Sequence, residues 1–397
     1  MFSPPAQMST HRLVDYQLRV VFQRYLAPDK SLEDKQGLLR WVEKRPSVRE
    51  AAPIIRLEDI ELRLELIDVI QMAYDESPCK AQRDEDGDFQ FTALQFVYFL
   101  VIPMEHLRGI RATPMVPYIP YIKLEDYLLF MVMGIMPDDA TIDRGTASTV
   151  SPDDTHTLSS GSEIPIDENA DERAKCIARD GGICVLTGAA YPEVCHIVPF
   201  EINATQAGLA YYREQFSHLT RLLGKESHVQ MIGLLDSELG CSDKAWNMLC
   251  LHPTLRDWWK KCLIGLKCLC IIPFSRRMGY HNIQLQFYWM PRGHDISPHD
   301  GAEPDRDMIQ EMLQITEQDD DPIKESQKSS SYRLQTGQVF SLTLPAEDAV
   351  KMRLMIDIQW ANARLAAMSG LSGNWVLLNR RPRVVNVDGR LEGKWQI

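Results

Sequence analysis

Two segments decide the fold of this chain: Glu193-Val194-Cys195-His196-Ile197-Val198-Pro199-Phe200 and Asn247-Met248-Leu249-Cys250-Leu251-His252-Pro253-Thr254-Leu255-Arg256-Asp257-Trp258-Trp259. The first is typical of a strand that ends at Pro199, because proline removes a hydrogen-bond donor from the strand ladder. In the second, an apolar strand over 248–251 precedes Pro253, a residue that suits the first turn of a helix. Together the two segments predict a strand-strand-helix unit.

A turn-rich stretch lies before the first strand. It contains Arg179-Asp180-Gly181-Gly182-Ile183-Cys184, followed by Thr187-Gly188. A Gly-Gly turn, a short β-branched run and a Thr-Gly turn are typical of a hairpin. We therefore expect a hairpin-like start to the unit.

The polar residues of the unit suit phosphodiester chemistry. Hydrolysis needs a base for water, a cation against the developing charge, and groups that hold both. His196, at a strand end, can be the base, because the unperturbed pKa of histidine lies near neutrality. Asn247 on the facing strand can fix the geometry, and a ligand from the following helix would complete a metal site. Taken alone, His196 is more typical of a satisfied core or turn histidine, and Asn247 can simply cap the strand turn.

In their order and spacing these residues resemble a known family. Arg-Asp-x-x-x-Cys, Thr-Gly, His-Ile-x-Pro-Phe, Asn-x-x-x-Leu and Leu-x-x-Trp-Trp look like the fungal branch of the His-Asn-His (HNH) nucleases. The likeness continues through Gly265-Leu266-Lys267, through 285–289 and through the predicted helix 354–370. The resemblance implies an α+β fold: a ββα-metal (HNH) nuclease module with added strands, preceded by a mainly helical N-terminal region.

The resemblance also implies a role for each matching residue. His196 matches the general base of the family, and Asn247 matches its middle asparagine. The second histidine of the family falls on Arg256, and arginine has no lone pair with which to ligate a cation. Arg256 is instead suited to contact phosphate.

The implied cofactor is a divalent ion (Mg, Mn or Zn), and three residues are its candidate ligands. Cys195 stands at the usual ligand position just before the base, although Mg²⁺ prefers oxygen to sulfur. Glu193 lies on the same strand face, and His252 lies one helical turn before the position of the missing histidine. Beside Pro253, however, His252 is also typical of a helix cap, and Trp258-Trp259 is more typical of core packing than of a surface on which bases stack.

Composition and periodicity predict the organisation of the whole chain. Apolar residues at helical spacing over 11–26 and 57–74 indicate helices, while 339–344 alternates like a strand and 349–368 is typical of a helix. We expect a mainly helical region at 1–140, a flexible polar linker at 141–170, the HNH-like domain at 171–293 and an acidic loop or linker at 294–331 that includes a turn or two of helix. A strand-helix extension at 332–373 should pack on the HNH-like domain, and 374–397 should form a basic tail.

Charge and cysteine content narrow the class of protein. The net charge of -12 argues against a protein that coats nucleic acid by charge alone. Nine scattered cysteines favour reduced thiols in an intracellular protein, of cytoplasm or nucleus, and the start of the chain lacks the pattern of a secretory signal. The longest apolar runs are too short to span a membrane. The expected partner is nucleic acid, DNA above all, and the N-terminal helices are candidates for binding a protein.

Three functions fit these observations. The first is a metal-dependent endonuclease that hydrolyses phosphodiester bonds in DNA with His196 as base. The second is a degenerate HNH-fold protein that has lost the metal and acts in nucleic-acid or protein binding. The third is a pocket turned to another reaction, because a shared fold does not settle function.

Overall fold

The computed structural model describes residues 47–75, 90–111, 124–136, 165–231, 233–292, 296–302, 305–313 and 334–375, together with Gln23, Ser31 and Lys35. The helix expected over 11–26 and the basic tail expected over 374–397 lie almost wholly outside these residues, as does most of the expected linker at 141–170. The described part mixes helices and strands, as expected for an α+β fold. Within it, no helix is both long enough and apolar enough to cross a membrane.

Two sheets organise the strands. The larger is antiparallel, in the order β1-β6-β5-β4, and is built from β1 (Ser47–Val48), β4 (Ile264–Pro273), β5 (Tyr280–Trp289) and β6 (Gln338–Pro345). The smaller is an antiparallel pair, β2 (Glu193–His196) and β3 (Met248–Leu251), in which His196 lies opposite Met248. The register of β4 on β5 shifts between Cys268 and Cys270, so the Cys-x-Cys pair lies at a bulge.

Helices from the N-terminal part of the chain pack beside this framework. They are η1 (Leu57–Asp59), α3 (Ile60–Asp75), α4 (Ala93–Val101), α5 (Met104–Arg111) and α6 (Leu124–Met133). The start of α4 is set by a capping box, in which Thr92 accepts from the backbone of Gln95 and the Gln95 side chain accepts from the backbone of Thr92. The strand β1 joins the same N-terminal region to the edge of the large sheet through β6.

The central part of the chain supplies the remaining helices. They are α7 (Ala170–Asp180), η5 (Phe200–Asn203), α8 (Gln206–Leu223), α9 (Lys225–Met231), η6 (Ala245–Asn247) and α10 (Pro253–Lys260). Arg179 and Asp180 are the last two residues of α7, and Gly181, in the left-handed conformation, ends that helix. The hairpin expected from Arg179 onward therefore begins later and spans fewer residues than predicted. The strand bridge there pairs Ile183 with Ala190.

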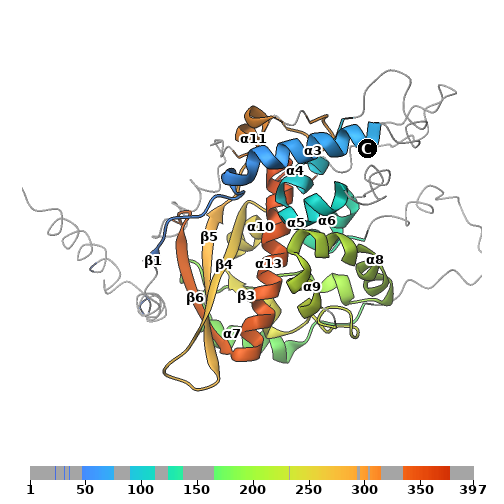
Figure 1. Ribbon diagram of the computed structural model, residues 1–397. Helices are drawn as coiled ribbons and strands as arrows, with labels where there is room; N and C mark the ends of the chain where they lie inside the picture. Colours follow the sequence, from blue (N-terminus) through green and yellow to red (C-terminus); the bar gives the residue numbers. More distant parts are fainter. Residues whose placement is uncertain are drawn as a thin grey trace, which may run out of the picture.

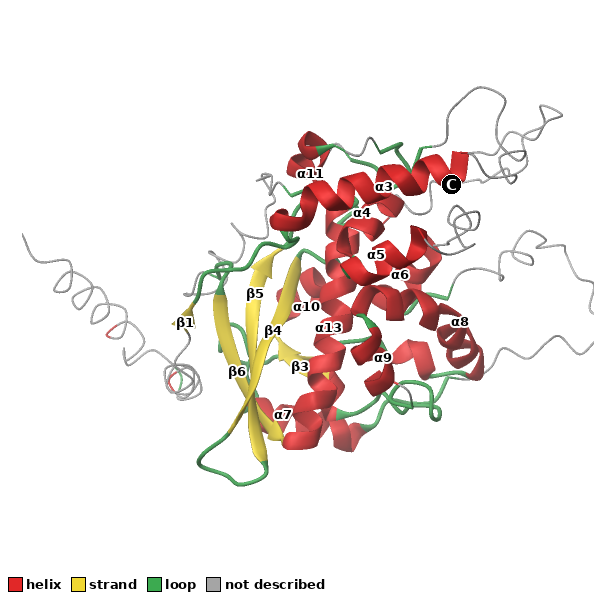
Figure 2. Ribbon diagram, viewed as in Figure 1, coloured by secondary structure: helices red, strands yellow, loops and turns green. Residues whose placement is uncertain are grey.

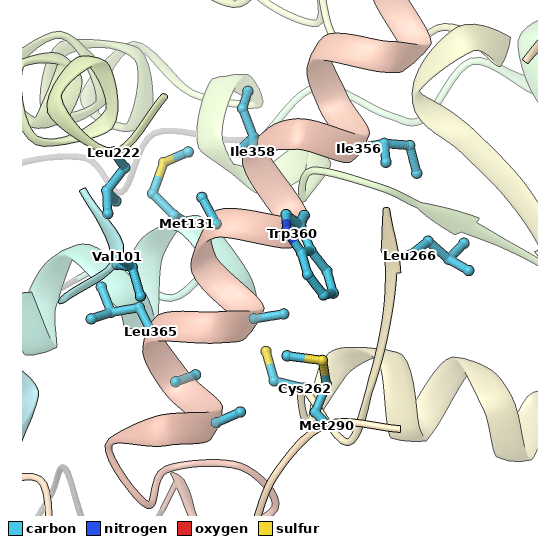
Figure 3. Packing of buried hydrophobic residues seen from close by; sticks show 14 of the residues in the cluster. Val101, Met131, Leu222, Cys262, Leu266, Met290, Ile356, Ile358, Trp360 and Leu365 are labelled. Carbon is cyan, nitrogen blue, oxygen red and sulfur yellow. The ribbon is translucent and has the colours of Figure 1, made fainter. Parts of the chain in front are cut away.

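The helix α13 (Ala346–Met368) lies at the centre of the described part of the molecule. Figure 1 shows it running between the large sheet and the group α5, α6, α8 and α9, and Figure 2 shows the same division between strands and helices. It contacts β4, α4 and α6 among others, and side chains all round it are buried, which is the pattern of a helix inside a core. In Figure 3, Ile358 and Leu365 lie on the side of the helices, while Trp360 points toward Leu266 of the sheet.

One hydrophobic cluster links these layers. Its buried members run from Ile55 in the N-terminal part to Leu371 after α13, and they include residues of the ββα unit. The short helix α11 (Arg306–Met312) joins it through Ile309 and Met312, and begins after Asp305, whose side chain accepts from the backbone N–H of Met308 at 2.7 Å. The division of the chain into separate domains stays a prediction.

Candidate functional site

The strand-strand-helix unit expected from the two segments is formed by β2, β3 and α10. Pro199 follows the end of β2, and Pro253 stands at the first position of α10. The cap of α10 is His252, whose Nδ1 accepts from the backbone N–H of Thr254 at 3.3 Å. The two prolines therefore mark the end of the first strand and the start of the helix.

Arg179 and Asp180 hold β3 in place from the end of α7. The guanidinium of Arg179 donates to the carbonyls of Ala245 (2.6 Å) and Met248 (2.7 Å) and to the carboxylate of Asp180. That carboxylate in turn accepts from the backbone N–H of Cys250 at 2.9 Å. The Arg-Asp pair of the signature thus fixes the turn that carries Asn247.

Asn247 is fully buried, and its side chain makes hydrogen bonds to backbone groups of neighbouring segments. Its Oδ1 accepts from the N–H of Val198 (3.0 Å), and its Nδ2 donates to the carbonyls of Val198 (2.8 Å) and Ser242 (3.1 Å). The backbone carbonyl of Asn247 also accepts from the N–H of Ile197 at 2.8 Å. Asn247 therefore fastens the segment that follows His196 and positions the end of the strand.

The side chain of His196 has a carboxylate partner that sequence reasoning missed. Its Nε2 lies 2.9 Å from Oδ1 of Asp243, while its ring stacks on Phe200 with 5.7 Å between ring centroids. The other oxygen of Asp243 accepts from the backbone N–H of Asn169, so both carboxylate oxygens are engaged. A carboxylate at Nε2 favours the tautomer that keeps Nδ1 free to accept a proton.

Asp243 is suited to remain ionised. Burial by itself raises the pKa of this carboxyl group, but hydrogen bonds from His196 and from the backbone of Asn169, together with the charge of Arg173, outweigh that effect. The pKa of Asp243 therefore lies below its usual value. The carboxylate of Asp243 can therefore orient the imidazole of His196 and stabilise the imidazolium that protonation would form.

His196 lines a pocket of about 70 Å³ that several elements enclose. Other residues of β2 and α10 line it, together with the end of α6 and two residues of α13, Gln359 and Asn362. Three cationic side chains, Arg173, Arg256 and Lys260, share it with the carboxylates Glu168 and Glu201. At roughly 10–15 Å³ for each water, the pocket admits about five to seven water-sized groups, enough for a phosphate group but not for a duplex.

The residues expected to hold a divalent ion do not fit one. Glu193 accepts from Nη1 of Arg256 at 2.5 Å, so a guanidinium stands where this carboxylate would meet a cation. Burial raises the pKa of the Cys195 thiol to about 12, and the protonated thiol donates to the carbonyl of His196 at 3.4 Å. His252 uses Nδ1 for the cap of α10. The structure thus offers no convergent donor set among Glu193, Cys195 and His252.

A different group in the described residues has its ligand atoms close enough for an ion. It consists of Cys176, Asp180 and Cys250, whose ligand atoms lie within 4.8 Å of one another and are buried. Nη2 of Arg179, however, already donates to Asp180 (2.9 Å) and to the sulfur of Cys176 (3.3 Å). The hydrogen bond between the thiols of Cys176 and Cys250, with burial and the charge of Asp180, raises the pKa of Cys250 far above its usual range. The guanidinium of Arg179 therefore already occupies two of the three groups through hydrogen bonds.

The remaining sequence interpretations concern packing. Trp258 and Trp259 are both buried, and Trp258 lies against Trp289 with 5.6 Å between ring centroids. The aromatic pair is therefore part of the core. Every cysteine in the described part of the chain is a free thiol, as the sequence favoured.

Comparison with known proteins identifies the same unit. A family model described as HNH endonuclease matches residues 184–267. The match contains β2, β3 and α10 and ends within β4, so α7 and α13 lie outside it. No curated protein and no solved structure matches the chain. The HNH endonuclease match suggests nuclease activity.

Proposed function

We propose that the chain hydrolyses phosphodiester bonds in DNA at the pocket that His196 lines. The observation that carries this proposal is the 2.9 Å contact between Nε2 of His196 and the buried carboxylate of Asp243, inside a segment that matches HNH endonucleases. A histidine held in this way leaves Nδ1 as a base. Arg173, Arg256 and Lys260 line the same pocket; Arg173 pairs with Glu168 and Arg256 with Glu193, so a phosphate would share these cations with the two carboxylates.

In the proposed reaction, Nδ1 of His196 takes a proton from water as the water oxygen attacks phosphorus. The bond between phosphorus and the leaving sugar oxygen breaks, and that oxygen takes a proton from solvent. Asp243 stabilises the imidazolium formed in this step. Asn247 positions the strand end through its three hydrogen bonds to the backbone.

The arrangement around Arg256 supports a mechanism in which a protein side chain, rather than a metal ion, neutralises the charge of the phosphate. This residue stands at the position of the second family histidine and pairs with Glu193. Both partners are partly exposed, with 39% and 45% of their side chains accessible, so the pair is held weakly and Arg256 can turn to a phosphate. Guanidinium binds phosphate well and keeps its charge at any physiological pH.

Plasmid nicking tests the proposal. Wild-type protein is compared with His196→Ala in EDTA and in added Mg²⁺, Mn²⁺ or Zn²⁺. We expect nicking by the wild type, its loss in His196→Ala, and activity that survives EDTA. Equal nicking by both proteins would dispose of His196 as the base, and activity found only with a metal would contradict the role given to Arg256.

The second candidate is a protein that binds nucleic acid through the HNH fold without cutting it. The ion pair between Arg256 and Glu193, formed where the family places a metal ligand, favours this function. It predicts that wild type and His196→Ala bind DNA equally and that neither nicks it under any of the metal conditions above.

A further inference from the structure

The wall of the pocket opposite β2 is formed by α13 and carries amide groups without partners. Gln359 and Asn362 lie one turn apart on that helix, and both line the pocket. Gln359 is 8% exposed and Asn362 is 1% exposed. Among the residues that the structure describes, the two amide nitrogens and the carbonyl oxygen of Gln359 have no hydrogen-bond partner.

A third unpartnered donor belongs to the same pocket. Nε of Arg256, on α10, is buried and has no partner in the described part of the chain, although Nη1 of the same side chain pairs with Glu193. These residues therefore give the pocket three unpartnered donor nitrogens and one unpartnered carbonyl oxygen, that of Gln359, while the carboxylates of Glu168 and Glu201 and the ring of His196 also line it. Buried polar groups are nearly always paired in folded proteins, so this concentration requires an explanation.

The excess of donors among these unpartnered atoms points to the chemistry of the ligand. Water both donates and accepts, so it has no preference for a wall of donors. An oxyanion accepts from all of them and also meets the positive charges of Arg256 and Lys260. The cavity of about 70 Å³ suits an anion of the size of a phosphate group.

We propose that Gln359 and Asn362, with Nε of Arg256, form a phosphate-binding site on the α13 side of the pocket. Two of its three residues come from outside the segment that matches HNH endonucleases. The site rests on the proposed function for its role, because it would hold the scissile phosphate beside His196. Fixed amide donors stabilise charge on oxygen in the way that backbone amides do in oxyanion holes.

The packing of Asn362 shows how the donors are aimed. Its Oδ1 accepts from the hydroxyl of Tyr127 on α6 at 2.8 Å, which fixes the amide plane and leaves Nδ2 as the free group. Tyr127 is itself buried, so the amide cannot turn away without leaving that hydroxyl unpaired. The donor of Asn362 is thus held before any ligand arrives.

Gln359→Leu provides the main test, because leucine keeps much of the volume and removes the unpaired atoms. The matched control is Gln286→Leu, a buried glutamine of the large sheet whose amide is hydrogen-bonded to the carbonyls of Arg49 and Gly337. The probe is inorganic phosphate, with sodium chloride at equal ionic strength as the reference. Titration calorimetry gives the Kd, and thermal unfolding of the full chain gives the Tm.

We expect phosphate to raise the Tm of the wild type beyond the effect of chloride. Gln359→Leu should weaken phosphate binding about tenfold or more, since one hydrogen bond to a charged group is lost. Its Tm without phosphate should equal or exceed that of the wild type, while Gln286→Leu should lower Tm and leave the Kd unchanged. Asn362→Asp, which keeps the acceptor for Tyr127 and adds negative charge, should abolish phosphate binding.

Three results would overturn this site: no phosphate effect beyond that of chloride, an equal Kd in wild type and Gln359→Leu, or a loss of Tm in Gln359→Leu as large as in Gln286→Leu. Phosphate binding that depends on Gln359, without cleavage of DNA, would uphold the site and refute the nuclease proposal. Cleavage by the wild type with an unchanged phosphate Kd in Gln359→Leu would do the reverse.

Discussion

Replacing Asp243 by asparagine should abolish most of the proposed activity while leaving the fold intact. One oxygen of Asp243 accepts from His196 and the other accepts from the backbone N–H of Asn169. An asparagine offers one acceptor and one donor, so it can satisfy only one of these contacts. In one orientation its NH₂ group opposes the N–H of Asn169, and in the other it forces the proton of His196 onto Nδ1, the nitrogen needed as base.

The size of the effect follows from the geometry of the pair. At 2.9 Å, with an effective dielectric constant of about 20, a carboxylate and an imidazolium attract by about 6 kcal/mol, which is an upper bound. The neutral amide keeps part of this interaction, and single hydrogen bonds to charged groups contribute about 1.5–3 kcal/mol. A loss of about 3 kcal/mol in the transition state corresponds to a fall in kcat of roughly 100-fold.

The assay is single-turnover cleavage of a labelled DNA duplex by wild type, Asp243→Asn and the control Asp257→Asn. Asp257 lies on α10 and pairs with Lys261, but its side chain is 57% exposed, so its replacement should change the rate little. If Asp243→Asn cleaves as fast as the wild type across the pH range, the carboxylate does not orient the base and the mechanism proposed here is wrong.

The remaining predictions concern stability, metal binding, thiol chemistry and pH. Arg179→Met should lower the free energy of unfolding, measured in urea, by about 3–5 kcal/mol, because it leaves the buried carboxylate of Asp180 without its ion-pair partner. A change under about 1 kcal/mol would show that Arg179 does not hold β3 in place. Arg256→His replaces a guanidinium with an imidazole, which can ligate a cation, and should therefore make nicking rise with added Zn²⁺ or Mn²⁺; nicking that does not respond to metal would contradict this. Cys195, with its pKa raised to about 12 by burial, should resist iodoacetamide at pH 8 in peptide mass spectra, and rapid alkylation would show a thiolate. Because the pKa of Asp243 is lowered in the folded state, its carboxylate stabilises the fold above the unfolded value of about 3.9, and this effect is lost as the pH falls below that value. The difference in unfolding free energy between wild type and Asp243→Asn should therefore shrink below about pH 4. A difference that stays constant with pH would refute the lowered pKa of Asp243.

The local parts of the fold could be predicted from the sequence. The two strands and the helix of the ββα unit have sharp signals, because proline cannot continue a strand ladder and suits the start of a helix. The strand β6 and the helix α13 also follow from alternation and helical spacing. The role of Arg179 could not be predicted in this way, because glycines are typical both of a helix end and of a turn, and the glycines after Asp180 do not distinguish the two.

The long-range part of the site could not be predicted. Asp243 lies 47 residues from His196 in the sequence and in a polar turn before Asn247, where an acidic residue has no local signature. The burial of Gln359 and Asn362 depends on helices and a sheet that cover α13 on opposite sides. Helical spacing shows which residues share a face, but only the packed structure shows that the polar face is buried too.

The most direct measurement is the tautomer of His196, read from nitrogen-15 spectra of the histidine-labelled protein near neutral pH, with His196→Gln to assign the resonance. We expect a proton on Nε2, donated to Asp243, and an unprotonated Nδ1 whose resonance shifts when phosphate binds. A neutral ring with its proton on Nδ1 would refute the proposed mechanism, because such a ring has no free nitrogen facing the water that it must activate.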